Sequence, residues 1–211
     1  MPQPTDRYEH EKKMEQEGRL PPGQSLTQKF PVLHYGSVPQ FDPMTWKFKI
    51  WGEVFEERTW TWEEFQELPQ SEVLMDIHCV TRWSKFDTTW KGVSVNDLIE
   101  KGLLHLKPDA AFVLQHAAGG YTTNLPLEAV LQDNFLLATH FDGQALTPDH
   151  GYPLRGIVGH IPEKTDLKTA YFWKGAKWLT GLEFLTEDQL GFWEKAGYHN
   201  EGDVWKEQRT R

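Results

Sequence analysis

Alternating hydrophobic and polar positions predict several β-strands in this chain. Residues 46–50 read Trp-Lys-Phe-Lys-Ile, a pattern of period two that ends at Gly52. The apolar stretches at residues 111–116 and 177–184 also predict strands. In residues 71–80 the same period places four side chains on one face of a strand: Val73, Met75, Ile77 and Cys79.

Capping residues predict short helices between these strands. Thr61 is followed three residues later by Glu64, the spacing of a capping box, and the helix it opens should end at Leu68. Ser94 is expected to cap a second helix of about two turns that stops at Gly102. Helices are therefore expected to be few and short.

Turn residues complete the prediction of the fold class. Asp142-Gly143 stands between two apolar runs and predicts a β-hairpin. Because strands outnumber helices, we expect an α+β fold with antiparallel or mixed β-sheets, short helices and long loops. Three predicted loops are rich in His, Arg, Lys, Tyr and Gly, and loops of that kind often carry functional sites. They comprise residues 119–126, 147–155 and 160–174.

The chain divides into a short arm and one domain. Residues 1–28 contain a charged stretch that is compatible with a helix, followed by the helix-breaking sequence Pro21-Pro22-Gly23. We therefore predict that they form an N-terminal arm. Residues 29–211 show no linker, repeat or low-complexity segment and predict a single domain. A total length of 211 residues is sufficient for one domain with a full hydrophobic core.

Composition and charge exclude several classes of protein. The net charge of −9 argues against binding to nucleic acid, for which a basic surface supplies much of the affinity. No run of eighteen apolar residues predicts a membrane span. The first thirty residues lack the apolar core of a secretory signal, so a cytoplasmic location is expected. Ten Trp and twelve Phe predict an aromatic core or pocket.

Cys79 is the only cysteine, which excludes an internal disulfide and any zinc site with two thiolates. At the end of an apolar strand it fits a small core residue as well as a functional thiol. His78 and Arg82 are close in sequence, and cationic neighbours favour the thiolate that attacks substrates or ligates metals. The pattern alone leaves a core residue, a nucleophile and a metal ligand all open.

Two loops offer groups suited to an anionic ligand. His150 and Arg155 flank a Gly- and Pro-containing loop, and arginine can bind a phosphate through two hydrogen bonds. A salt-bridged arginine on a surface loop explains that pattern equally well. Lys174 and Lys177 stand beside Gly175 just before a predicted strand, where they could also be solvated.

Together these segments resemble the molybdopterin-binding domain of the sulfite oxidase family, in particular its small single-domain bacterial and archaeal members. The resemblance covers nearly the whole chain, and the order, spacing and number of the matching segments make it specific. They are LPPGQ (20–24), KFPVLHYG (29–36), DIHCVTRWS (76–84), WKGV (90–93), GGYTTNLPL (119–127), HGYPLR (150–155), FWKGAKWLTG (172–181), GFWEKAGYH (191–199) and WKEQR (205–209).

The resemblance implies an α+β fold built around a buried mononuclear Mo-molybdopterin cofactor. The metal-ligating cysteine of the family matches Cys79, which would also be catalytic. The residues that hold the pterin and its phosphate match His150, Arg155 and Lys177. Arg82 follows Cys79 closely and is assigned a catalytic contact with pterin or substrate.

Four further positions follow from the same resemblance. His34 and Tyr35 lie where related enzymes approach the cofactor from the N-terminal side. Thr122 and Asn124 are expected near the open face of the metal. All four are therefore predicted to contact the cofactor.

The implied activity is a two-electron oxygen-atom transfer on a small substrate that the sequence does not identify. The substrate-side arginines and tyrosine of sulfite oxidase itself cannot be placed here, so sulfite is a poor candidate. No haem or flavin motif is present, and a separate electron-transfer partner is expected. The alternatives are an inactive homologue, a cofactor-carrying binding protein and, less favoured, a Cys–His thiol hydrolase or transferase.

Overall fold

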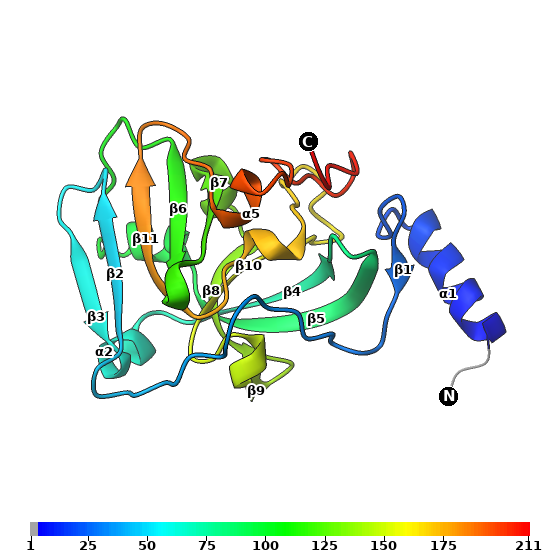
Figure 1. The fold of residues 1–211 in the computed structure, drawn as a ribbon, viewed down its shortest axis with the longest axis horizontal. Helices are drawn as coiled ribbons and strands as arrows, with labels where there is room; N and C mark the ends of the chain where they lie inside the picture. The colour runs from blue at the N-terminus through cyan, green and yellow to red at the C-terminus, as the bar shows by residue number, and fades with distance from the viewer. Residues whose placement is uncertain (1–3) are drawn as a thin grey trace.

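The computed structural model describes residues 4–211, and it folds them into two β-sheets packed face to face, with a helix at one end (Figure 1). Among the strands of residues 4–211 two pairs are parallel, β1 with β5 and β2 with β11, and the remaining pairs are antiparallel. The predicted α+β class with mixed sheets and short helices is confirmed.

The first sheet has five strands in the order β3-β2-β11-β6-β7. Its strands span Lys47–Gly52 (β2), Arg58–Thr61 (β3), Phe112–Ala117 (β6), Thr122–Pro126 (β7) and Leu179–Leu185 (β11).

The second sheet has six strands, and β5 is its longest member, pairing with β1, β4 and β8. Its strands span Ser25–Leu26 (β1), Ser71–His78 (β4), Trp83–Val93 (β5), Phe135–Phe141 (β8), Gln144–Ala145 (β9) and Arg155–Val158 (β10).

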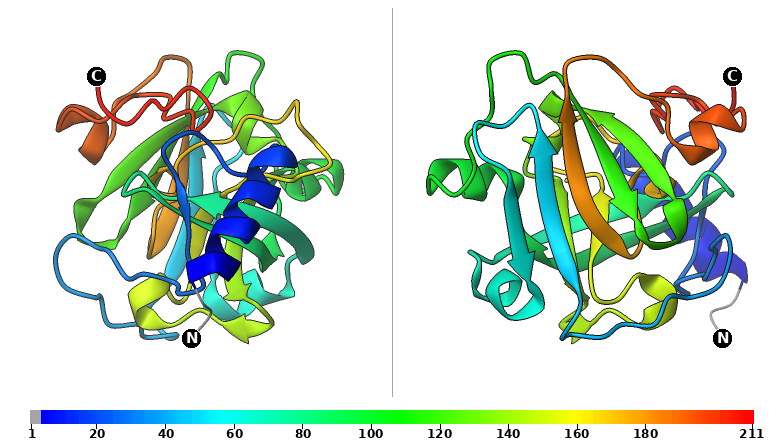
Figure 2. Two further views of the ribbon diagram at one scale, coloured as in Figure 1. Left: turned by 90° about the vertical axis from the view of Figure 1, so that its right-hand side faces the viewer. Right: turned by 60° about the vertical axis from the view of Figure 1, so that its left-hand side comes forward.

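Short helices connect some of the strands, one helix precedes the first strand and another follows the last (Figures 1 and 2). The α-helices span Pro4–Gln16 (α1), Trp62–Glu67 (α2), Val95–Glu100 (α3), Leu127–Val130 (α4) and Phe192–Lys195 (α5). Three 3₁₀ turns span Ala118–Gly120 (η1), Pro148–His150 (η2) and Phe172–Lys174 (η3).

The main hydrophobic core lies between the two sheets. Fully buried side chains from β2 and β11, such as Ile50 and Leu182, meet others from β8, such as Leu137. A second cluster covers the opposite face of the six-stranded sheet, where Met75 and Trp90 pack with the partly buried Phe30. Both faces of this sheet are therefore covered, which explains why β4 ends in four consecutive buried residues.

The local predictions at turns and caps are confirmed. Thr61 and Glu64 form the reciprocal hydrogen bonds of a capping box at the start of α2. Ser94 accepts a hydrogen bond from the Asp97 backbone at the start of α3. Asp142 and Gly143 both have positive φ and join β8 to β9, the geometry of a two-residue hairpin.

Other local predictions differ from the structure. Residues 119–126 were expected to be one loop, but Thr122–Pro126 forms β7 at the edge of the five-stranded sheet. Pairing with β6 supplies the backbone hydrogen bonds that the local sequence pattern does not reveal. In β4 the predicted apolar face is interrupted by a change of register between Met75 and Ile77, and Cys79 lies just beyond the last strand residue.

The predicted arm contributes to both helix and sheet. Helix α1 packs Met14 against Leu20 and Phe86, and β1 pairs in parallel with the start of β5. The boundary at residue 28 stays a prediction, and residues 1–3 lie outside the described part. Between residues 4 and 211 no helix is both long and apolar enough to cross a membrane.

Candidate functional site

A cavity of about 340 Å³ opens where six segments of the chain converge. These segments are the one that follows β1, the turn from β4 into β5, the connection from β6 to β7, the start of β10, the stretch from η3 to β11, and helix α5. Five of the residues predicted from the sequence line it: His34, Tyr35, Cys79, Arg155 and Lys177.

Cys79 is buried at the base of a tight turn. Its backbone N–H donates to Trp83 O at 2.8 Å, and its carbonyl accepts from Arg82 N at 3.0 Å. Its Sγ lies 3.1 Å from the Thr81 hydroxyl. In the described chain no imidazole is hydrogen-bonded to this sulfur, so the Cys–His hydrolase has no general base in place.

The charges around Cys79 differ from those expected. Burial raises the pKa of its thiol, while the Thr81 hydrogen bonds and the positive charge of Arg209 oppose that rise. His78 points away and bonds to Ser84, and burial lowers its pKa to about 3, so it is neutral. The cations near the thiol are Arg209 of the C-terminal tail and the cavity residues Arg155 and Lys177, and not the residues adjacent in sequence.

Arg155 begins β10 and is buried, with 1% of its surface exposed. Its guanidinium donates to three backbone carbonyls, those of Gly156, His150 and Gly175. It also lies over the Phe172 ring, 4.1 Å from the centroid. No carboxylate within residues 4–211 forms an ion pair with it, and burial lowers its pKa to about 9, so the charge remains at neutral pH.

Lys177 stands beside Arg155 and is also without a paired carboxylate in the described chain. Its Nζ donates to the carbonyls of Leu33 at 2.9 Å and Asp149 at 2.6 Å. Burial and the nearby Arg155 lower its pKa to about 7. Arg155 and the protonated form of Lys177 thus bring positive charge to one cavity with only carbonyl oxygens as hydrogen-bond partners, an arrangement that an anionic ligand would stabilise.

His34 and Tyr35 come from the segment that crosses the six-stranded sheet (Figure 1). The His34 ring lies edge-on to Trp178, and its Nε2 is 3.8 Å from Asp149. The Tyr35 ring, 70% exposed, lies 5.0 Å from that of Phe192. Both residues form the outer wall of the cavity.

His150 lies behind the cavity wall. Its ring stacks on Phe30 with centroids 3.9 Å apart, and its Nε2 is 3.3 Å from the Phe30 carbonyl. Its own carbonyl accepts from Arg155. In this structure His150 holds the 30–37 segment and Arg155 in place, and its contact with a cofactor stays a prediction.

The structure does not bring the other three predicted residues to the cavity. Arg82 has positive φ and points outward, toward Gly23 and Glu207. Thr122 is on β7, and the side chain of Asn124 bonds to Asp188, Asn200 and Lys174 instead of facing the cavity. Their predicted roles in catalysis and cofactor binding have no support from position.

The sequence predicts an aromatic core or pocket, but it does not show which aromatic residues line the cavity. Part of the signal is present in the segments FWKGAKWLTG and GFWEKAGYH, whose aromatic residues are closely spaced. The aromatic side chains at the cavity that were not predicted are Trp83, Tyr121, Phe172, Trp173, Trp178, Phe192 and Trp193.

The cavity fits a bulky anionic group that carries a metal. Arg155 and Lys177 offer positive charge to a phosphate, and the aromatic walls suit a planar ring. Cys79 can supply one thiolate. Within residues 4–211 no cluster of three or more His, Cys, Asp or Glu could hold a metal ion.

Comparisons with known proteins agree with this geometry. A family described as "Oxidoreductase molybdopterin binding domain" matches residues 35–193. The chain is 45% identical over 196 residues to "Uncharacterized oxidoreductase YuiH" of Bacillus subtilis (strain 168), covering 92% of this chain and 93% of that protein.

Two more distant proteins are also similar. "Putative protein-methionine-sulfoxide reductase subunit YedZ1" of Azospira oryzae is 26% identical over 181 residues, covering 84% of this chain and 64% of that protein. The crystal structure of the sulfane dehydrogenase SoxCD from Paracoccus pantotrophus superposes with a TM-score of 0.63 at 17% identity, covering 82% of this chain and 47% of that one. This last likeness concerns the fold alone.

Proposed function

The chain belongs to the oxidoreductase molybdopterin binding domain family, and from that premise we propose that it carries out two-electron oxygen-atom transfer on a small neutral oxide. It is an oxidoreductase enzyme, and its cofactor is the molybdenum cofactor. The sequence-based identification of the family, the enzyme class and the cofactor is confirmed.

One observation supports the proposal most strongly. A buried thiol and two basic side chains that form no ion pair with a described carboxylate line the same cavity. Cys79 would ligate the metal, while Arg155 and Lys177 would bind the cofactor phosphate. The bound cofactor supplies the oxygen-atom transfer chemistry, and the chain supplies binding and orientation. Aromatic walls would exclude water around the reacting group.

The lining of the cavity supports a neutral substrate. Arg155 and Lys177 would be occupied by the cofactor. The other described residues that line the cavity are largely aromatic or apolar, and His34 lies at the edge. An anion such as sulfite or nitrate would then lack a permanently charged partner there. A sulfoxide or N-oxide needs only a hydrogen bond at its oxygen and apolar contact around it, and the name of the YedZ1 relative points to a sulfoxide.

Electron supply and location are part of the same proposal. A separate protein or soluble carrier would exchange electrons with the enzyme, since the sequence contains no haem or flavin motif. The cytoplasmic location expected from the N-terminal sequence is likewise proposed, and fractionation of cells that express the protein would test it.

The test measures molybdenum and pterin per chain in protein from a host that makes the cofactor. Wild type, Cys79→Ser and the control Arg58→Gln, a surface substitution on β3, are compared. We expect near-stoichiometric molybdenum in wild type and control. Cys79→Ser should keep much of its pterin and lose turnover, because the phosphate contacts survive.

Turnover is then measured with reduced dye and a panel of sulfoxides and N-oxides, with nitrate reduction and sulfite oxidation assayed beside them. Faster turnover of the neutral oxides supports the substrate class, and preference for either anion rejects it. Wild-type turnover in Cys79→Ser would reject the ligand assignment. A bound cofactor without turnover of any substrate would favour the carrier or inactive homologue.

A further inference from the structure

The turn that carries Cys79 is stabilised by segments far from it in sequence. Strand β4 ends at His78, and Cys79 is separated from β5 by only three residues. Arg82 closes this turn with a φ of 73°, a left-handed conformation that is strained for a side chain of its size. Residues 79–82, called the cysteine turn below, therefore need support from their surroundings.

The N-terminal arm supplies the first support. Gln24 Nε2 donates to the Cys79 carbonyl at 3.0 Å, and Ser25 N donates to the Arg82 carbonyl at 2.9 Å. Gln24 is 8% exposed and belongs to the quoted segment LPPGQ. The arm thus contacts both ends of the cysteine turn.

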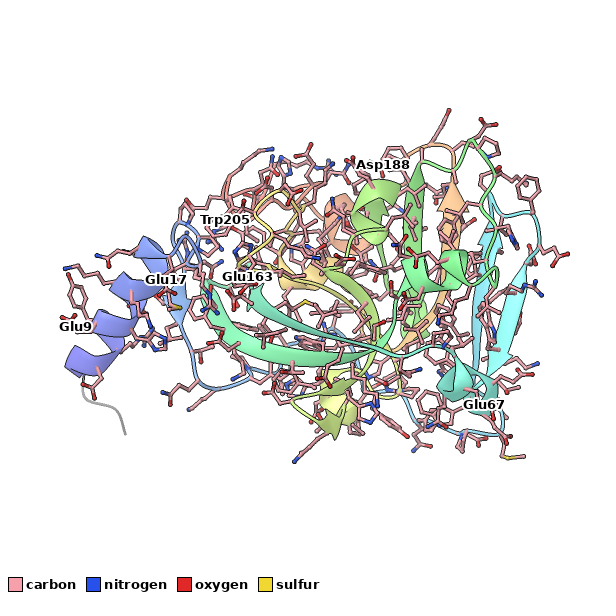
Figure 3. The ribbon with its side chains drawn as sticks, turned by 180° about the vertical axis from the view of Figure 1, so that it is seen from behind. Glu9, Glu17, Glu67, Glu163, Asp188 and Trp205 are labelled. Atoms are coloured by element: carbon pink, nitrogen blue, oxygen red, sulfur yellow. The ribbon has the colours of Figure 1, made fainter. Side chains whose placement is uncertain are left out.

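The C-terminal tail supplies the second support, through Arg209. Its guanidinium donates to the Val80 carbonyl at the centre of the cysteine turn, and to the carbonyls of Pro22 and Gly23 at 3.4 Å each. Figures 1 and 2 show the tail beside the loop that joins α1 to β1. Trp205 of the tail lies near the end of β4, its ring 6.1 Å from that of His78 (Figure 3).

Arg209 is also tied to the wall of the cavity. Its guanidinium lies 4.9 Å from the centroid of the fully buried Tyr171 ring, and Tyr171 directly precedes the lining residues Phe172 and Trp173. The Arg209 side chain is 12% exposed, and Glu207 Oε1 lies 3.2 Å from its Nε. One planar cation therefore joins the arm, the cysteine turn and the cavity wall.

The arm has a glycine where it approaches the tail. Gly23 has a φ of +67°, which favours glycine, and a Cβ there would lie 2.5 Å from Glu207 Oε1 and 2.9 Å from Arg82 Nη1, so these two side-chain ends would have to move. The quoted segments LPPGQ and WKEQR, which the proposed function leaves without a role, meet at this point.

We propose that Arg209 is a positioning residue that fixes the Cys79 sulfur with respect to the cofactor, with Gln24 as its counterpart on the arm. This proposal rests on the proposed function, in which Cys79 ligates molybdenum. Arg209 touches neither the cavity nor the sulfur, and it acts by holding the backbone of the cysteine turn. Groups that orient a metal ligand in this way typically contribute about 10–100-fold to activity or metal affinity.

The experiment compares Arg209→Gln and Arg209→Lys with the matched control Lys206→Gln. Lys206 is on the same tail, 65% exposed, and pairs only with Glu201 and Asp203 among the described contacts. Cofactor-loaded protein is examined for pterin and molybdenum content, the Mo(V) electron paramagnetic resonance spectrum, and kcat and KM with the best sulfoxide or N-oxide. Cofactor-free protein is examined by hydrogen exchange of residues 79–84.

In Arg209→Gln we expect faster hydrogen exchange in the cysteine turn, an altered Mo(V) spectrum and a roughly 10–100-fold lower kcat, with KM little changed. Arg209→Lys should recover part of the kcat, because an ammonium can still donate to the Val80 carbonyl. Lys206→Gln should match wild type in every measurement. A merely structural role would lower the melting temperature and leave the spectrum of the loaded molecules unchanged.

A wild-type Mo(V) spectrum and kcat in Arg209→Gln would overturn the proposal, as would unchanged exchange in the cysteine turn. If Arg209→Gln does not fold, Gln24→Met serves in its place, since it removes the bond to the Cys79 carbonyl with little change of volume. An altered spectrum there supports the proposal and a wild-type spectrum rejects it. Failure of the proposed function is seen separately, as wild-type protein that binds no molybdenum.

Discussion

Two buried cations only nineteen residues apart differ in their partners: Lys174 is paired with a carboxylate and Arg155 is not. Lys174 and Arg155 are each 1% exposed. The Nζ of Lys174 lies 2.7 Å from Glu194 Oε1 and bonds to Asn124 and Asn200 as well. Arg155 has carbonyl oxygens alone as its polar partners in the described chain.

The difference separates a structural charge from a binding charge. Lys174 and Glu194 balance each other and connect η3 to α5, and Thr123 donates to the same carboxylate. Arg155, together with Lys177, leaves a positive charge uncompensated beside a cavity. Because burying a charge without a countercharge is costly, Lys174 and Glu194 need no ligand, and an anion would stabilise Arg155 and Lys177.

Breaking the structural pair should have the largest effect. Lys174→Met leaves the fully buried Glu194 without its cation, and we expect the free energy of unfolding to fall by about 3–5 kcal/mol. Urea denaturation of the cofactor-free protein measures it. The double variant Lys174→Met/Glu194→Leu should recover much of the loss. A double variant as unstable as the single one would show that the charge balance is not the cause.

Removing the charge of Arg155 should mainly lower the amount of cofactor bound per chain. Arg155→Met deletes a charged hydrogen-bond donor worth about 1.5–3 kcal/mol, so we expect pterin and molybdenum per chain to fall roughly tenfold or more. The cofactor-free variant should lose less stability than Lys174→Met, because no carboxylate is left unpaired. Full cofactor content in purified Arg155→Met would place this residue with Lys174 as a structural cation.

The smallest expected effect is a pH dependence of stability that comes from the lowered pKa of Lys177. Its pKa of about 7 in the cofactor-free fold lies below the usual lysine value of 10.5, so the unfolded chain binds more protons between these values. Stability should therefore rise with pH from about 7 to 10.5. Lys177→Met should flatten that rise in melting temperature, with Lys206→Gln as the control. If the melting temperature of Lys177→Met rises with pH as steeply as that of the wild type, the lowered pKa of Lys177 is not the cause of the rise.

Short-range patterns predicted much of the fold. The capping box at Thr61 and the hairpin at Asp142 follow from residues within four positions of each other, and both are present. Strand β7 was missed because its partner β6, rather than its own alternation, stabilises it. The mixed α+β class could be predicted since it depends on the number of strands and not on their order.

The candidate site was predicted in part, and through resemblance rather than through spacing. Cys79, Arg155 and Lys177 do meet at one cavity, together with His34 and Tyr35. Asn124 was expected there too, yet it bonds in the Lys174 network. Nothing in the sequence distinguishes these positions, because the side to which a polar side chain turns depends on the partners that the fold brings to it.

The sequence by itself determined the single thiol, the acidic charge, the caps and the hairpin, because each depends on residue type or on neighbours a few bonds away. Tertiary structure alone decided which cation is neutralised, since the partner of Lys174 is twenty residues away and Arg155 has none among the described carboxylates. It also decided that Arg209, from the other end of the chain, is one of the cations near Cys79. Electrostatic energy depends on distance in space and on burial, and neither can be read from sequence separation.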